Sequence, residues 1–455
     1  MTNVVLIHTD DTGRYVGPYG HQVETPALER LADEGVLFRN AFCAGPTCSP
    51  ARGALLTGQS PHSNGLVGLA HRGFAMENYD RHLAGYLSRN GYESVLAGQQ
   101  HEADPAGLDT DVDDRQQNRY DAAREVLGYD RTLDGDVDAA RDIPIDHERT
   151  RRDLANSAAA ASYLRDRAGE ETPFFLSVGL WNTHDPMPLD QNRVDPDRVS
   201  PPRQLPDVPA VREETAAFRV LVEYVDECVE TVVEALRDSG QLEETLLLFT
   251  TDHGAPFPLM KGSLFDGGIE VALLARFPDD LRAEDGEGNA EDALVSHVDV
   301  FPTICDCLDI DVPSWVEGTS LLSLVRGETD RVREAVYSEL SYHGTYEPKR
   351  CVRTDRYKYI RRFDGEDAGW TNVPGGRSAS FLEERGVYDR ERPREALYDC
   401  YLDPGERENL VDDPDHAGVY DDLSDRLEEW MRATDDPLLD GSVPAPDGAR
   451  VERRE

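Results

Sequence analysis

Lysine is nearly absent from this chain. Of its 455 residues only Lys261, Lys349 and Lys358 are lysines, and 47 basic residues stand against 90 acidic ones, for a net charge of −43. A chain this acidic has nothing with which to neutralise a phosphate backbone, which excludes nucleic-acid binding. Long hydrophobic runs are missing as well. No stretch approaches the roughly 20 apolar residues that cross a bilayer, so we expect no membrane segment.

The sequence also has no basic, apolar leader, because it runs directly into the apolar residues 3–8. A secretory signal needs such a leader, so we expect a cytoplasmic protein. Seven cysteines are an odd number, and in that compartment we expect reduced thiols. The acidic residues are spread along the whole chain. This composition resembles that of haloarchaeal proteins that work in concentrated salt; the alternative interpretation is an ordinary acidic enzyme.

Short apolar runs alternate with helical patterns through about residue 330. This alternation predicts an α/β fold with a large, mostly parallel sheet sandwiched by helices. Strands are expected at residues 3–8, 93–97, 173–181, 245–251 and 271–277, and helices at 26–34, 50–57 and 211–239. Two stretches without periodicity are expected to be long surface loops, 102–150 and 186–209.

From about residue 335 the pattern changes to short, aromatic-rich strands followed by one helix. The strands are expected at residues 335–342, 350–354 and 357–363, and the helix at 420–434. We therefore expect two units. The larger α/β domain covers residues 1–334, and a smaller α+β subdomain with an antiparallel sheet and a terminal helix covers residues 335–455.

Acidic side chains follow two of the predicted strands. Asp10 and Asp11 follow the first strand, and Asp252 and His253 follow strand 245–251. Ligands collect at the carboxyl ends of the strands in an open α/β sheet, and adjacent carboxylates are costly to hold together unless a cation neutralises them. Oxygen ligands favour Ca²⁺ or Mg²⁺, and the imidazole also allows Mn²⁺. We expect one divalent cation, with Ca²⁺ as the first choice; the alternative is a set of solvated loop acids.

A cysteine stands at the start of a predicted helix in the segment 45–58. Pro50 suits a first helical turn and Gly58 suits a helix end. Cys48 therefore lies where free backbone amides and the positive end of the helix dipole favour an anion. Taken alone, a cysteine is more often a small buried hydrophobic residue than a catalytic group. The residues around it decide between these interpretations.

The motif Cys48-x-Pro50-x-Arg52, followed by Leu-Leu-Thr-Gly, closely resembles the signature of type I sulfatases in the alkaline-phosphatase superfamily. Residues 25–32 and the lysine-bearing loop 261–268 resemble further segments of that family, in the expected order. Residues 64–69, 254–258 and 397–410 are most similar to the heparan N-sulfatase (sulfamidase) branch. The resemblance implies an alkaline-phosphatase-like fold and a sulfuric ester hydrolase. It also implies that a formylglycine-generating enzyme oxidises Cys48 to formylglycine.

The resemblance implies a role for each candidate residue as well. The ligands of the divalent cation are Asp10, Asp11, modified Cys48, Asp252 and His253. The hydrated aldehyde of modified Cys48 is the nucleophile, and Arg52 holds it in place. His184 and Lys261 assist the leaving group, and His101 promotes the release of inorganic sulfate. The expected substrate is a small sulfated molecule, either a sugar or an aryl or alkyl sulfate.

Two positions depart from the family pattern. Gln99 stands where the family usually has a lysine, and losing one positive contact to sulfate costs a few kcal/mol of transition-state stabilisation. His253 stands where this branch usually has asparagine, although other sulfatases and phosphonate monoester hydrolases have histidine there. Two alternatives therefore stay open. One is a phosphodiesterase or phosphonate monoester hydrolase with the same nucleophile, and the other is a non-catalytic sulfoglycan-binding protein in which Cys48 stays a thiol.

Overall fold

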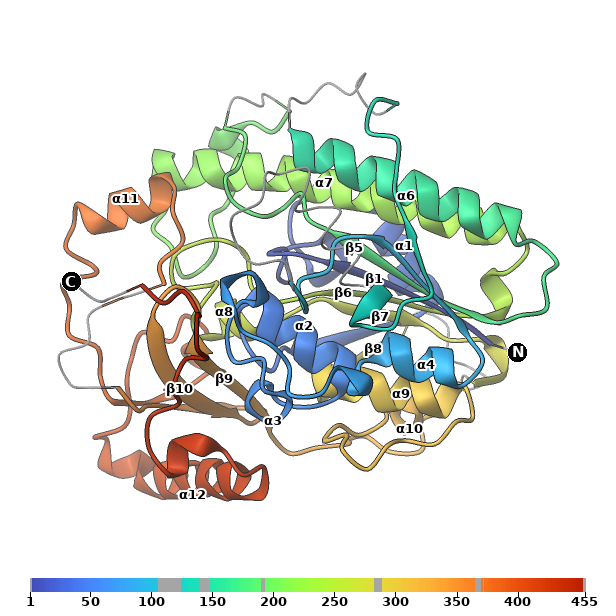
Figure 1. Ribbon diagram of the computed structural model, residues 1–455. Coiled ribbons are helices and arrows are strands. Elements are labelled where there is room, and N and C mark those ends of the chain that lie inside the picture. Colours follow the sequence, from blue (N-terminus) through green and yellow to red (C-terminus); the bar gives the residue numbers. More distant parts are fainter. Residues whose placement is uncertain are drawn as a thin grey trace.

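A computed structural model describes residues 2–104, 124–139, 147–189, 193–281, 289–364, 370 and 372–452. Within these residues the centre of the molecule is an eight-stranded sheet (Figure 1). In order across the sheet the strands are β4 (Arg131–Leu133), β3 (Glu93–Gly98), β5 (Phe174–Leu180), β1 (Asn3–Thr9), β6 (Thr245–Thr251), β7 (Leu273–Arg276), β2 (Val36–Phe42) and β8 (Asn289–Ser296). Only β7 runs antiparallel to its neighbours. The predicted mostly parallel sheet is confirmed.

Alternate side chains of the central strands feed two separate apolar cores, as the two-residue period of a strand requires. In β1, Val4 and Leu6 face one core, while Val5 and Ile7 face the other. The helices over the first core are α2 (Cys48–Thr57), α4 (Leu83–Arg89), α9 (Val300–Cys307) and α10 (Leu322–Val325). Those over the second are α1 (Pro26–Glu34), α6 (Glu148–Asp166) and α7 (Pro209–Asp238), at the top of Figure 1. A strand buried on both faces reads as a continuous apolar run, which is why β1 and β6 are evident from sequence.

Several elements are not evident from the sequence pattern, among them β8, α6 and β2. β8 is an edge strand that carries Glu291 and Asp292, and these acids hide its apolar residues. α6 buries small side chains such as Ala160 and Ala161, which give a weak helical period. β2 alternates imperfectly between buried and exposed positions.

The two predicted surface loops are only partly loops. The prediction for 102–150 is wrong at β4 and at the first turn of α6, because small and charged residues mask both elements. In the second stretch the chain forms one short 3₁₀ turn, Pro196–Arg198, before α7 begins at Pro209. Residues 105–123, 140–146 and 190–192 of these predicted loops lie outside the described residues.

A second, antiparallel sheet follows, as predicted, with the three expected strands and a fourth that was not predicted. Its order is β12 (Glu395–Asp399), β11 (Tyr357–Arg362), β10 (Tyr346–Arg353) and β9 (Val336–Tyr342). The last long helix, α12 (Ala417–Ala433), covers one face through Leu423, Leu427 and Met431. The other face adds Cys351 and Ile360 to the core of the large sheet. Three short helices complete the described regular structure apart from 3₁₀ turns: α3 (Pro61–Asn64), α8 (Asp266–Ile269) and α11 (Arg377–Glu383).

The cysteines and lysines, which are few in this chain, are all buried. All seven cysteines are free thiols, as expected. Each of the three lysines is buried against a carboxylate, in the pairs Lys261–Asp11, Lys349–Glu347 and Lys358–Asp266. The exposed basic groups of the described residues are therefore arginines. Across the same residues, every helix is too short or too polar to cross a bilayer.

Candidate active site

Four neighbouring strands place polar side chains at one edge of the large sheet. β3, β5, β1 and β6 are adjacent and parallel, and Thr9, the last residue of β1, is level with Leu180 and Thr251. The polar residues that follow these strands are His101 after β3, His184 after β5, Asp10 and Asp11 after β1, and Asp252 and His253 after β6. Because the strands end together, residues far apart in sequence meet at one place.

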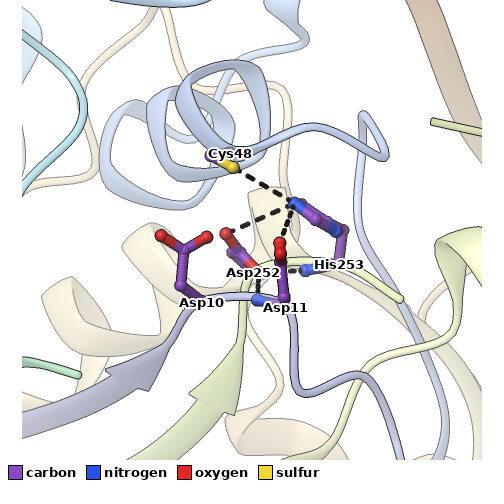
Figure 2. A group of neighbouring side chains, drawn as sticks. All are labelled: Asp10, Asp11, Cys48, Asp252 and His253. Atoms are coloured by element: carbon purple, nitrogen blue, oxygen red, sulfur yellow. Dashed lines mark hydrogen bonds and ion pairs between the residues drawn. The ribbon is translucent and has the colours of Figure 1, made fainter. Parts of the chain in front are cut away.

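Five buried side chains form a compact cluster at this edge, shown in Figure 2. One ligand atom from each lies within 4.8 Å of the others, and the five are Asp10, Asp11, Cys48, Asp252 and His253. Asp252 organises the cluster, since its Oδ1 accepts hydrogen bonds from the backbone N–H groups of Asp11 (2.9 Å) and His253 (2.8 Å). Asp11 has a left-handed backbone with φ 57°, a conformation that aspartate tolerates. The turn at Asp11 lets two successive carboxylates reach the same cluster.

The cluster has the chemistry of a cation site. Within the described part of the chain, Oδ1 of Asp10, Oδ1 of Asp11 and Oδ2 of Asp252 are buried and have no hydrogen-bond donor. Buried ionised oxygens without a partner cost several kcal/mol each. The Nδ1–H of His253 donates to the Gly254 carbonyl at 3.0 Å, so the Nε2 lone pair faces the carboxylates. Burial lowers the pKa of His253 to about 4, which keeps the imidazole neutral and able to bind a metal. Carboxylate oxygens with one imidazole suit a divalent cation.

Crowding perturbs the pKa values of the carboxyl groups. Burial and the nearby Asp10 raise the pKa of Asp252 well above its usual range. Burial also raises the pKa of Asp11, although Lys261 opposes this. For Asp10 burial acts in the same direction, but His101 and Arg52 outweigh it and hold the pKa below its ordinary value. The negative charge of this site is therefore only partly compensated by side chains.

Cys48 is the first residue of α2, as predicted, and its sulfur lies 3.5 Å from Nε2 of His253. Gly58 ends the helix with φ 68°, a conformation that glycine adopts without strain. Burial and Asp10 raise the pKa of the Cys48 thiol. An unmodified Cys48 therefore stays protonated and is a poor nucleophile.

Arg52 lies one helical turn after Cys48 and is completely buried. Its Nε is 3.6 Å from Oδ2 of Asp252, and its Nη1 is 2.6 Å from Nδ1 of His8. The other ring nitrogen of His8 is 2.9 Å from the Ser177 hydroxyl. His8 thus holds the Arg52 guanidinium in position. Sequence reasoning missed this role because His8 lies within β1, where a buried histidine reads as part of the strand.

Lys261 and His184 form a second pair beside the cluster. The Lys261 ammonium donates to Oδ2 of Asp11 at 2.7 Å and lies 3.3 Å from Nε2 of His184. The Nδ1–H of His184 donates to the Asp185 carbonyl at 2.8 Å. Burial and Lys261 lower the pKa of His184 to about 4, while Asp11 outweighs burial and raises that of Lys261. A charged ammonium therefore faces a neutral imidazole.

Cys48, His101, His184 and Lys261 together line one cavity of about 770 Å³. His101 approaches the cluster from β3, with its Nδ1 3.2 Å from Oδ2 of Asp10. Gln99 is buried and its amide donates to the Gln100 carbonyl at 3.1 Å, so it brings no charge to the cavity. Other lining residues, among them Arg149, Trp181 and His343, have no recognisable sequence signal.

Solved structures place this architecture in the alkaline-phosphatase fold. A 2-O GAG sulfatase has a TM-score of 0.70 at 22% identity, over 99% of this chain and 96% of its own. A phosphonate monoester hydrolase from Silicibacter pomeroyi has a TM-score of 0.71 at 20% identity, over the whole of both chains. At these identities the likeness shows the fold alone, and it confirms the predicted fold class.

Sequence comparison identifies the family. The sulfatase family model matches residues 2–310, more than half of the chain, so the chain belongs to the sulfatase family of sulfuric ester hydrolases. A model for the C-terminal region of N-sulphoglucosamine sulphohydrolase matches residues 259–371. The human N-sulphoglucosamine sulphohydrolase is 28% identical over 491 aligned residues, which cover 99% of this chain and 93% of the human one. The prediction of a sulfatase is confirmed, and the phosphonate hydrolase alternative is not favoured.

Proposed function

We propose that this sulfatase hydrolyses the sulfate ester or N-sulfonate of a sulfated sugar, using Cys48 oxidised to formylglycine and one bound divalent cation. The observation that carries the proposal is the convergence of three buried carboxylates and a neutral imidazole on Cys48 within 4.8 Å. Ca²⁺ is the expected ion, with Mg²⁺ and Mn²⁺ as alternatives. Residues 1–334 form the catalytic domain in this proposal, and residues 335–455 form the C-terminal subdomain.

The oxidation of Cys48 is inferred from its surroundings and from the family. The raised pKa of the thiol disfavours a thiolate nucleophile at this position. A formylglycine-generating enzyme removes that difficulty, because the hydrated aldehyde offers a hydroxyl oxygen in place of sulfur. The bound cation supplies Lewis-acid polarisation of the sulfuryl oxygens. Arg52, fixed by His8, orients the hydroxyl and adds positive charge.

Lys261, His184 and His101 are placed to transfer protons. Lys261 holds a proton at Nζ, directed at Nε2 of His184, so the pair is placed to protonate a leaving oxygen or nitrogen. His101 lies on the other side of the cavity against Asp10 and is placed to accept the proton that leaves the hydrated aldehyde when sulfate is released. Human N-sulphoglucosamine sulphohydrolase, the 28% identical relative, supports a sugar substrate.

We also propose that the enzyme works in concentrated salt. The net charge is −43, and none of the three lysines remains on the surface. A strongly acidic, arginine-based surface repels itself in dilute buffer. At about 1 M salt the Debye length falls to about 3 Å, and this repulsion is screened.

Peptide mass spectrometry of the protein from its native host tests the proposal. We expect an aldehyde at Cys48 and an intact thiol at Cys43, a buried cysteine five positions away that serves as an internal control. Cys48→Ala should abolish hydrolysis of an aryl sulfate without unfolding the chain, whereas Cys43→Ala should retain it. Comparison of an aryl sulfate with an aryl phosphodiester and a phosphonate ester should show preference for the sulfate. A thiol at position 48 in fully active enzyme contradicts the proposed nucleophile.

A further inference from the structure

The wall of the active-site cavity differs in charge from the rest of the molecule. Four basic side chains line it, Arg72, Arg149, Arg152 and Lys261, against three acidic ones, Asp104, Glu148 and Asp185. In the whole chain the ratio is 47 basic to 90 acidic residues. The cavity wall therefore lacks the acidic excess of the rest of the chain, which favours an anionic ligand.

One of these cations lacks a carboxylate partner. Ion pairs neutralise the other three, namely Arg72 with Glu452, Arg152 with Glu148 and Lys261 with Asp11. No carboxylate oxygen of the described residues lies within ion-pair distance of Arg149, although the charges of Asp10, Asp11 and Asp185 act on it from farther away. Its Nη1 instead donates to the carbonyls of His184 and Asp185. These bonds fix the orientation of the guanidinium and leave its charge without a close carboxylate among the described residues.

Trp181 sets the position of this charge relative to the reacting groups. The Arg149 guanidinium lies over the Trp181 ring, 4.7 Å from its centroid. That ring is 6.4 Å from the ring of His101 and 6.3 Å from that of His184. Arg149 is thus held beside the two histidines that flank the cavity, with a rigid aromatic support.

The formal charges around the cation site balance one sulfate group without Arg149. Three carboxylates face the cation site, and a divalent cation with Arg52 and Lys261 exceeds their charge by one. That excess matches the single negative charge of one sulfate ester. Arg149 lies in the same cavity as Asp104 and Asp185, and its charge is not part of this balance.

We propose that Arg149 binds a second anionic group of the substrate, a carboxylate or another sulfate on the sugar that leaves. The inference rests on the proposed function and narrows its substrate class to sulfated sugars with a second acidic group. A planar guanidinium suits this task because it pairs with carboxylate or sulfate oxygens through two parallel hydrogen bonds. Both observed hydrogen bonds of Arg149 use Nη1, so Nε and Nη2 serve the ligand.

Binding of sulfated sugars to a variant that cannot turn them over tests this proposal. Calorimetry on Cys48→Ala with saturating Ca²⁺ compares glucosamine 2-N,6-O-disulfate with N-acetylglucosamine 6-O-sulfate. We expect the disulfate to bind at least about tenfold more tightly, because its second sulfate forms a charge-assisted pair with Arg149. Adding Arg149→Gln should remove that preference. Adding Arg152→Gln, which removes a cation already paired with Glu148, should keep it, and Arg149→Lys should restore part of it. Equal affinities in the Cys48→Ala protein, or a preference that survives Arg149→Gln, overturn the proposal.

Turnover of a singly charged substrate separates this role from others. Arg149→Gln in the formylglycine-bearing enzyme should lower kcat/KM for glucosamine 2-N,6-O-disulfate at least about tenfold more than kcat/KM for 4-nitrophenyl sulfate, which has no second anionic group. An equal loss with both substrates would mean that Arg149 acts on the reacting sulfate or positions His184, and would overturn the inference. Failure of the proposed function would look different, because the wild-type enzyme itself would not turn over any sulfate ester, whatever the binding preference.

Discussion

Replacing Asp252 by asparagine should change stability in opposite directions with and without a divalent cation. Asp252 is buried beside Asp10 and Asp11, and its Oδ2 has no hydrogen-bond donor among the described residues. The substitution removes the charge but retains an oxygen that accepts from the N–H groups of Asp11 and His253. In the absence of a cation it therefore relieves repulsion, and in the presence of a cation it removes a ligand.

The structure gives the size of the effect. Ligand atoms of the three carboxylates lie within 4.8 Å of one another, a separation at which two unit charges repel by about 3.5 kcal/mol at an effective dielectric constant of 20. Asp252 has two such neighbours, and Arg52 at 3.6 Å offsets about 5 kcal/mol. Asp252→Asn should therefore stabilise the cation-free protein by about 2 kcal/mol. With about 2.1 cal/mol/K of unfolding entropy per residue, this raises Tm by about 2 °C.

The direction of the pH dependence follows from the raised pKa of Asp252. Between the unfolded-state pKa of about 4 and the higher folded-state pKa, the folded protein binds more protons than the unfolded one. Its stability therefore falls as pH rises through that interval. Asp252→Asn lacks this term, so its advantage in chelator should grow from pH 5 to pH 8. A saturating cation at about 1,000 times its Kd adds about 4 kcal/mol to the wild type, and the order of the two proteins should then reverse.

Thermal unfolding followed by circular dichroism, in chelator and in Ca²⁺, measures these differences. Asp266→Asn is the matched control, because Asp266 is equally buried but lies against Lys358 and Arg353. These cations outweigh burial and lower the pKa of Asp266. Removing the Asp266 carboxylate should therefore destabilise the protein in both buffers. If Asp252→Asn were less stable than wild type in chelator, the account of an uncompensated carboxylate cluster would be wrong.

Three further outcomes are expected. Lys261→Met should lower kcat on an aryl sulfate by about 10²-fold to 10³-fold, the effect of removing one charged group at a reacting centre, and a loss below about threefold would exclude Lys261 from leaving-group protonation. Exhaustive chelation should abolish hydrolysis, and titration with Ca²⁺, Mg²⁺ and Mn²⁺ should restore it, with the most effective ion identified by kcat; full activity in chelator would contradict the metal site. Because the net charge of −43 repels a sulfated substrate, kcat/KM should rise from 0.05 M to about 1 M salt as screening increases, and a maximum in dilute buffer would contradict the proposed halophilic character.

The sequence predicted the elements whose signals are local. Buried central strands such as β1 and β6 are continuous apolar runs, and α7 keeps its helical period over 30 residues. Edge strand β8 and the alanine-rich α6 were hidden, because acidic or small side chains interrupt the apolar pattern. Local signals thus mark the core of the sheet better than its periphery.

For the site, the sequence by itself determined the candidate residues that meet in one cluster, since acids after parallel strands and a cysteine at a helix start are short-range patterns. Only the tertiary structure decided what surrounds them. The contact of His8 with Arg52 joins residues 44 positions apart, and that of Lys261 with Asp11 joins residues 250 positions apart. The lack of an ion pair at Arg149 within the described residues likewise depends on packing. The physical reason is that burial and neighbouring charge set the pKa and the orientation of a side chain, and both are properties of the packed molecule.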